Sequence, residues 1–64
     1  MNQGYLVTIN ANFKIILKDG ATLILGGASH FEVDFNHNEV IFKDNDGKNI
    51  ALFLREDITS ICKV

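Results

Sequence analysis

The alternation of apolar and polar residues from Tyr5 to Leu17 is the feature that most limits how this chain can fold. Every odd-numbered residue of the stretch is apolar, and the even-numbered residues are mostly polar, with Leu6 and Ile16 as exceptions. Successive side chains of a β-strand point to opposite faces, so the pattern predicts one long amphipathic strand. Because strands usually run about 3 to 10 residues, such a strand must bend around a small barrel or extend beyond its own subunit.

The tripeptide Lys18-Asp19-Gly20 predicts the first hairpin turn. A three-residue loop pairs Leu17 with Ala21 and keeps the apolar residues of both strands on one face, which a two-residue loop would not do. Gly20 supplies the left-handed backbone conformation that the third position of this loop requires.

A second hairpin of the same type is predicted at Asn45-Asp46-Gly47. By the same matching of faces, Phe42 pairs with Ile50 and Val40 pairs with Leu52. Turn chemistry and strand periodicity therefore indicate the same arrangement at both hairpins.

Residues 29–35 alternate polar and apolar and predict a strand between the two hairpins. A turn at residues 36–39 follows it. Pairing Phe35 with Val40 and Val33 with Phe42 keeps the apolar face of this strand continuous with that of the next one.

We therefore predict a single all-β domain over residues 1–64. It is a small, strongly bent antiparallel meander of five or six strands, forming a small barrel or half-barrel with little or no helix. Arg55-Glu56-Asp57 interrupts the alternation and predicts one helical or 3₁₀ turn, and residues 60–64 predict a closing strand beside the first strand. The predicted core contains Val7, Ile9, Phe13, Ile15, Leu17, Leu23, Leu25, Phe31, Val33, Phe35, Val40, Phe42, Ile50, Leu52, Leu54, Ile58 and Ile61.

The chain resembles Sm-like and SH3-like barrels in the rhythm of its last fifty or so residues. The resemblance lies in Ile15-Ile16-Leu17-Lys18-Asp19-Gly20, in the long middle hairpin, and in the ending Leu54-Arg55-Glu56-Asp57-Ile58-Thr59-Ser60-Ile61. It implies a bent meander that closes through a short final strand. The uracil-binding residues of the Sm family have no counterpart in the sequence, so the resemblance implies a fold and no activity.

Size and composition favour self-association. A chain of 64 residues buries only about 60% of its unfolded surface, so its stability is expected to be marginal. Cys62 is the only cysteine, which excludes an internal disulfide, and association with another chain is the remaining way to gain stability. The net charge of −2 argues against sequence-independent binding of nucleic acid. We expect a cytoplasmic protein that does not contact membranes.

A second apolar face supports this expectation. Assigning the residues listed above to the core leaves apolar side chains on the opposite face of the sheet, where polar residues are usual. A contiguous apolar strip generally marks an interface, so we expect a self-association face here, ahead of a face for a partner protein or ligand and ahead of chance scatter. The predicted interface consists of Leu6, Ile16, Ile24, Ile41, Ala51 and Phe53.

Two sets of polar residues are candidate sites. His30, Glu32 and Asp34 share one strand face and could bind a cation or perform acid–base chemistry, but their spacing along a flat strand favours a solvated surface. The acidic residues of the turns could instead contact a basic partner surface, since they lack the spacing of an EF-hand. These residues are Asp44, Asp46, Glu56 and Asp57.

We expect a non-enzymatic, homo-oligomeric β protein that binds another macromolecule, with a protein as the expected partner, and inhibits or adapts it, as small proteins of phages and mobile elements do. The alternative is a binder of a small nucleotide signal, with pockets at subunit interfaces lined by Lys14, Lys18 and Arg55 together with the polar strand residues His30, Glu32 and Asp34. An Sm-like nucleic-acid binder ranks below both because of the acidic charge. The sequence predicts no catalytic residue, no cofactor and no metal site, and Cys62 is expected to be buried as a small apolar residue.

Overall fold

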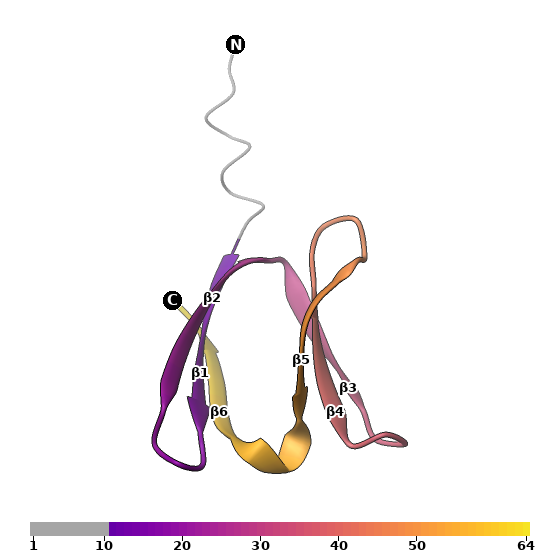
Figure 1. The fold of residues 1–64 in the computed structure, drawn as a ribbon. Coiled ribbons are helices and arrows are strands. Elements are labelled where there is room, and N and C mark those ends of the chain that lie inside the picture. Colours follow the sequence, from indigo (N-terminus) through magenta and orange to yellow (C-terminus); the bar gives the residue numbers. More distant parts are fainter. Residues whose placement is uncertain (1–10) are drawn as a thin grey trace.

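A computed structural model describes residues 11–64, which form two three-stranded antiparallel sheets (Figure 1). The first sheet has the strand order β2-β1-β6 and the second has the order β3-β4-β5. The strands are β1 (Ala11–Leu17), β2 (Thr22–Ala28), β3 (His30–Asp34), β4 (Glu39–Lys43), β5 (Asn49–Leu54) and β6 (Ile58–Lys63), and the 3₁₀ helix η2 (Arg55–Asp57) connects β5 to β6. The all-β antiparallel meander, the 3₁₀ turn and the closing strand beside β1 are confirmed.

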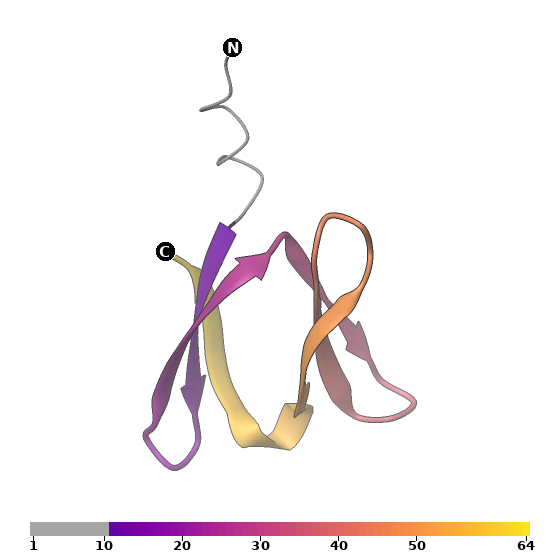
Figure 2. The ribbon, with the colours of Figure 1, turned by 45° about the horizontal axis from the view of Figure 1, so that its top comes forward.

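No closed barrel is found within residues 11–64, so the structure does not confirm the barrel part of the prediction. The chain passes from one sheet to the other at Ser29 and again at η2. Among the described strands, β2, β6, β3 and β5 each pair with a neighbour on one side only. Figure 2 shows the two sheets as separate layers joined at these two crossings. The half of the predicted first strand that precedes residue 11, which includes Leu6, lies outside the described residues.

The first hairpin has the predicted register. Ile15 lies opposite Leu23 and Phe13 lies opposite Leu25. The amide of Leu17 donates to the carbonyl of Ala21 at 2.9 Å, and Gly20 has a φ of +95°. The three-residue loop therefore sets the inward face of β1 and β2, as turn chemistry indicated.

The second hairpin has the predicted turn but not the predicted register. The amide of Asp44 donates to the carbonyl of Lys48 at 3.0 Å, which closes the three-residue loop. An irregularity between Phe42 and Lys43 then shifts the pairing, so that Phe42 lies opposite Ala51 rather than Ile50. One extra residue on β5 reverses the faces of the whole strand, because side chains alternate with a period of two.

This shift corrects the predicted core and interface on β5. Ala51 and Phe53 pack against the core, so their predicted outward direction is wrong. Leu52 and Leu54 are exposed instead, by 52% and 44%, and so is Ile50. The five residues from Ile50 to Leu54 are all apolar, so this run lacks the alternation that indicates the inward face of β1, and the sequence does not distinguish the two faces. Packing selects Phe53, whose ring lies 5.8 Å from that of Phe42.

The turn between β3 and β4 starts one residue earlier than predicted. Asp34 lies opposite Glu39, and Val40 pairs with Val33 rather than with Phe35. A side-chain oxygen of Asp34 accepts hydrogen bonds from the amides of Asn36 and His37, at 3.0 and 3.2 Å. Such a bond from an aspartate to the following backbone initiates a turn, and it leaves Phe35 exposed by 72% rather than in the core.

The core lies between the inner faces of the two sheets. Its buried members are Phe13, Ile15, Ala28, Val40 and Phe42. Phe42 is fully buried, and its ring lies 5.5 Å from the rings of both Phe13 and Phe31. The inward direction predicted for Ile15 and Phe42 is confirmed. The inner side chains of the edge strands β2 and β3 keep their predicted parity but remain more than one-third exposed at Leu23, Phe31 and Val33.

Candidate functional site

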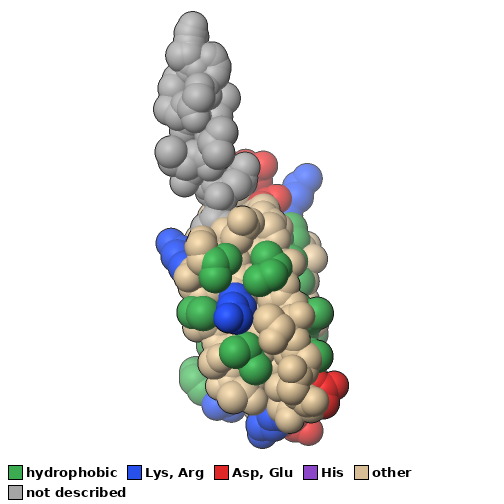
Figure 3. Space-filling model, turned by 90° about the vertical axis from the view of Figure 1, so that its left-hand side faces the viewer, with side chains coloured by type: hydrophobic (Ala, Val, Ile, Leu, Met, Phe, Trp, Pro, Cys, Tyr) green, Lys and Arg blue, Asp and Glu red, His purple; other side chains and the backbone are tan. Residues whose placement is uncertain are grey.

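The outer face of the first sheet carries separate apolar side chains around a basic one. Lys14 lies opposite Ile24 on one side and Cys62 on the other, and Ile16 follows it along β1. Ile24 is exposed by 62% and Ile16 is half-buried, so both lie on the outer face as predicted. Cys62 is exposed, which corrects the expectation that it is buried. Figure 3 shows this side of the molecule, with hydrophobic side chains spaced around a basic one.

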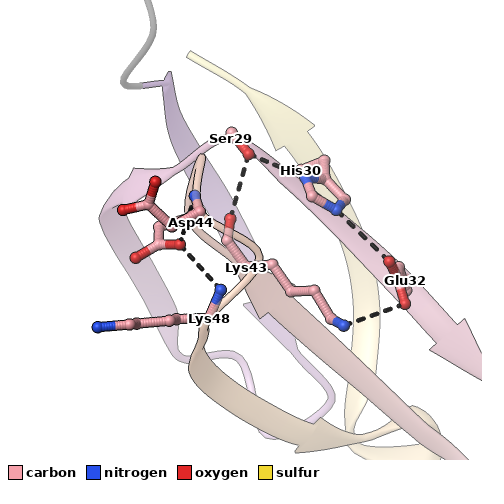
Figure 4. Close-up of polar contacts among 7 residues, drawn as sticks. Ser29, His30, Glu32, Lys43, Asp44 and Lys48 are labelled. Atoms are coloured by element: carbon pink, nitrogen blue, oxygen red, sulfur yellow. Dashed lines mark hydrogen bonds and ion pairs between the residues drawn. The ribbon is translucent and has the colours of Figure 1, made fainter.

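The outer face of the second sheet has a polar half on β3. Glu32 is central to it: one carboxylate oxygen lies 3.5 Å from His30 Nε2 and the other lies 3.5 Å from Lys43 Nζ (Figure 4). Ser29 Oγ lies 2.8 Å from His30 Nδ1 and donates to the carbonyl of Lys43 at 3.4 Å. The charges on this half are therefore partly compensated within the protein.

Asp34 does not join His30 and Glu32, although all three lie on the predicted strand face. Its carboxylate accepts a hydrogen bond from Nδ1 of His37 at 2.8 Å. Within residues 11–64 no group of three His, Cys, Asp or Glu side chains could hold a metal ion. The interpretation of His30, Glu32 and Asp34 as a solvated strand face therefore fits the geometry better than a three-ligand site.

The contact between Asp34 and His37 shifts both pKa values. The side-chain hydrogen bond, followed by the attraction of opposite charges, raises the pKa of His37 above 6.5, and the same hydrogen bond lowers the pKa of Asp34 below 3.8. The contribution of His37 to folding is present below pH 6.5 and is lost as pH rises through its raised pKa. The contribution of Asp34 is present above pH 3.8 and is lost as pH falls through its lowered pKa. The pair therefore stabilises the fold most between these two values.

We expect an NMR titration of the His37 ring protons to give a midpoint above 6.5 in the native protein. In Asp34→Asn the midpoint should fall towards that value, because the amide keeps an oxygen for the turn but no charge for the imidazolium. Asp46→Asn, in another turn, is the control and should leave the midpoint of His37 unchanged. An equal midpoint in the native protein and Asp34→Asn would contradict the assignment.

The other half of this outer face is apolar and lies on β4 and β5. Ile41 lies directly opposite Leu52, and Leu54 lies opposite Glu39. Opposite residues of neighbouring strands are in contact distance, so Ile41 and Leu52 form one apolar row that Leu54 extends along β5. Of the six residues predicted as an interface, Ile41 alone belongs to this row. The residues that the sequence reasoning missed are Leu52 and Leu54, and the uniformly apolar run of β5 was the signal that its face was undetermined.

An exposed aromatic residue lies at one end of this face. The guanidinium of Arg55 lies 4.5 Å from the centre of the Phe35 ring, and its Nη1 donates to Asn38 Oδ1 at 3.0 Å. Asn38 Nδ2 in turn donates to Glu56 at 3.1 Å. These contacts tie the β3–β4 turn to η2. A shallow hollow of about 380 Å³ lies beside them, lined by Glu32, Val33, Asp34, Phe35, Asn36 and Ile41.

The structure does not bring the predicted acidic tips together. Asp44 and Asp46 lie in the turn before β5, whereas Glu56 and Asp57 lie in η2 after it, so the two pairs are at opposite ends of that strand (Figure 1). The carboxylate of Asp44 is used locally, since it accepts from the amides of Asp46 and Lys48 at 2.9 Å each.

The three basic residues considered for a nucleotide site lie on three different elements. Lys14 lies on the outer face of β1 and Lys18 lies in the first hairpin turn. Arg55 is held against Phe35 by the contacts described above. The amide of Lys18 donates to the carbonyl of Asp57 in η2 at 3.0 Å, so the first hairpin turn lies against the 3₁₀ helix that contains Arg55.

No protein-family model, curated protein or solved structure matches this chain. Within residues 11–64, no helix is long and apolar enough to span a membrane.

Proposed function

We propose that this chain is a non-enzymatic, homo-oligomeric binding protein that contacts another protein through the outer face of its second sheet. The observation that carries the proposal is the division of that face into an apolar half, formed by Ile41, Leu52 and Leu54, and an acidic half. Contiguous exposed apolar surface with a polar rim is typical of protein–protein contact.

The acidic half gives the chemistry of the partner. Glu32, Asp34 and Glu39 lie on the outer side of β3 and β4; Glu32 is in contact with Lys43 and His30, and Asp34 is in contact with His37. A partner surface with apolar side chains next to lysine or arginine would complement both halves. Inhibition or adaptation of the partner would follow from covering its surface, without any chemical step in this protein.

The proposal predicts that Ile41→Lys abolishes capture of the partner. Ile41 lies on the central strand and its side chain is half-buried on the outer face, so a lysine there removes the middle of the apolar row. The experiment is affinity capture by the tagged protein from extracts of the cells that make it, followed by identification of the retained proteins. Captured partners should also be released by salt, because Debye screening weakens their contact with exposed carboxylates.

The matched control is Ile24→Lys, the same substitution on the outer face of the first sheet. A protein retained by the native chain and by Ile24→Lys, but not by Ile41→Lys, supports the proposal. Equal retention by all three would contradict it, provided that circular dichroism shows both variants to be folded.

A further inference from the structure

The open edge of β5 lacks the charged side chains that two of the other three edge strands of the described residues carry. Within residues 11–64 β5 pairs only with β4, and its residues from Ile50 to Leu54 carry no charge. Natural proteins usually protect an exposed edge strand with charged side chains, proline or a covering segment. The edge strand β3 carries Glu32 and Asp34. β6 carries Lys63. β2 is uncharged like β5, but it ends in Gly26-Gly27-Ala28, which offers few side-chain atoms to a partner strand.

The hydrogen-bonding pattern shows which groups of β5 face this edge. The amide of Arg55 donates to the carbonyl of Asn38 at 2.9 Å, in the same register that pairs Leu54 with Glu39. In an antiparallel pair, hydrogen-bonded and non-hydrogen-bonded positions alternate. Phe53 is therefore bonded to β4, whereas Leu52 and Leu54 direct their N–H and C=O groups to the open edge. Their side chains are about half exposed as well.

We propose that two copies of this chain pair through β5 about a two-fold axis at Leu52, which joins the two second sheets into one sheet. The apolar run from Ile50 to Leu54 is symmetric about Leu52, so antiparallel pairing centred there matches every member of the run with another member. Leu52 meets Leu52 of the second copy, Ile50 meets Leu54, and Ala51 meets Phe53. Beyond the strand ends, Lys48 in the turn before β5 of one copy comes to the same end of the pair as Glu56 in η2 of the other copy, and the two carry opposite charges.

Pairing in this register extends the apolar row described above. Ile41 and Leu52 lie next to each other in one copy, and the two-fold axis places Leu52 of the second copy beside the first Leu52. The row across the dimer therefore runs Ile41, Leu52, Leu52, Ile41, with a Glu32 beyond Ile41 at each end. On the inner face, the pairing adds an apolar contact between Phe53 of one copy and Ala51 of the other. A second copy fits this edge because a dimer buries an uncharged strand without placing like charges opposite each other. The dimer is the self-association that the proposed function includes.

The test is the mass of the purified protein in solution, measured by sedimentation velocity over a concentration series. We expect the native chain to form a dimer of the 7.1 kDa subunit. Leu52→Lys and Leu52→Glu should each weaken the dimer about tenfold or more, because they place like charges opposite each other across the axis. An equimolar mixture of the two variants should restore the dimer, since lysine then meets glutamate.

Ile24→Lys and Ile24→Glu are the matched controls, because Ile24 is an exposed isoleucine on the other sheet. Both should remain dimeric. A monomeric native chain, an assembly larger than a dimer, a dimer that survives both Leu52 variants, or a mixture that stays monomeric would overturn the proposal. Circular dichroism checks that each variant is folded. Because no partner protein is present, failure of this test leaves the capture experiment unaffected, and failure of the capture experiment leaves this test unaffected.

Discussion

Replacing Phe42 with alanine is expected to lower the free energy of unfolding by about 3–5 kcal/mol, because the substitution removes a fully buried ring and leaves a cavity. Phe42 joins the two sheets: its ring contacts Phe13 of the first sheet and Phe31 and Phe53 of the second. A domain of this size has little stability to lose, so Phe42→Ala should be largely unfolded at room temperature.

Urea denaturation followed by circular dichroism measures this effect. Phe42→Leu keeps most of the volume and should give a measurable transition even if the alanine variant does not fold. The control is Phe35→Ala, which removes the exposed ring beneath Arg55 and should cost about 1 kcal/mol or less. Equal losses at Phe42 and Phe35 would mean that the core is not where the structure places it.

The second large effect is expected at Ile15. Ile15 is fully buried on the inner face of β1, and truncation of a buried isoleucine to alanine costs about 2–5 kcal/mol. The neighbouring Ile16→Ala should cost about 1 kcal/mol, because its side chain lies half-buried on the outer face. The two substitutions remove the same atoms from adjacent residues. The difference between their losses in free energy of unfolding therefore shows which of the two side chains faces the core.

The midpoints and slopes of the urea transitions of the two variants give the free energy of unfolding that each substitution removes. If Ile16→Ala proves the more destabilising of the two, the faces of β1 are reversed, and the register of the first hairpin would have to shift by one residue as well.

Strand faces were predictable wherever the sequence alternates strictly. In β1 the inward direction of Phe13 and Ile15 followed from parity, and the Asp19-Gly20 turn fixed the pairing with β2. The strand alternation and the turn chemistry are independent of each other, and they predicted the same register in this hairpin. At β3 the alternation gave the correct inward direction for Val33, but the end of the strand depended on whether Asp34 or a later residue initiates the turn. Several polar residues in that segment could do so, and the sequence does not rank them.

The candidate interaction surface could be predicted only in part. The alternation of β4 predicts the outward direction of Ile41, whereas the prediction that Leu52 and Leu54 lie in the core is wrong. The error came from one extra residue after the second turn, which has no signature in an uninterrupted apolar run. The contact of Arg55 with Phe35 was also missed, since it joins residues that are distant in the sequence.

The sequence by itself determined the all-β class, the two three-residue turns and the faces of β1 and β4, because these depend on local backbone chemistry and on a period of two. Tertiary structure decided which face of β5 enters the core, because every residue of that run is apolar and only the fit of Phe53 against Phe42 distinguishes the two choices. It also decided that the two sheets of residues 11–64 remain separate layers without closing, since that depends on how the crossings at Ser29 and η2 orient the two sheets.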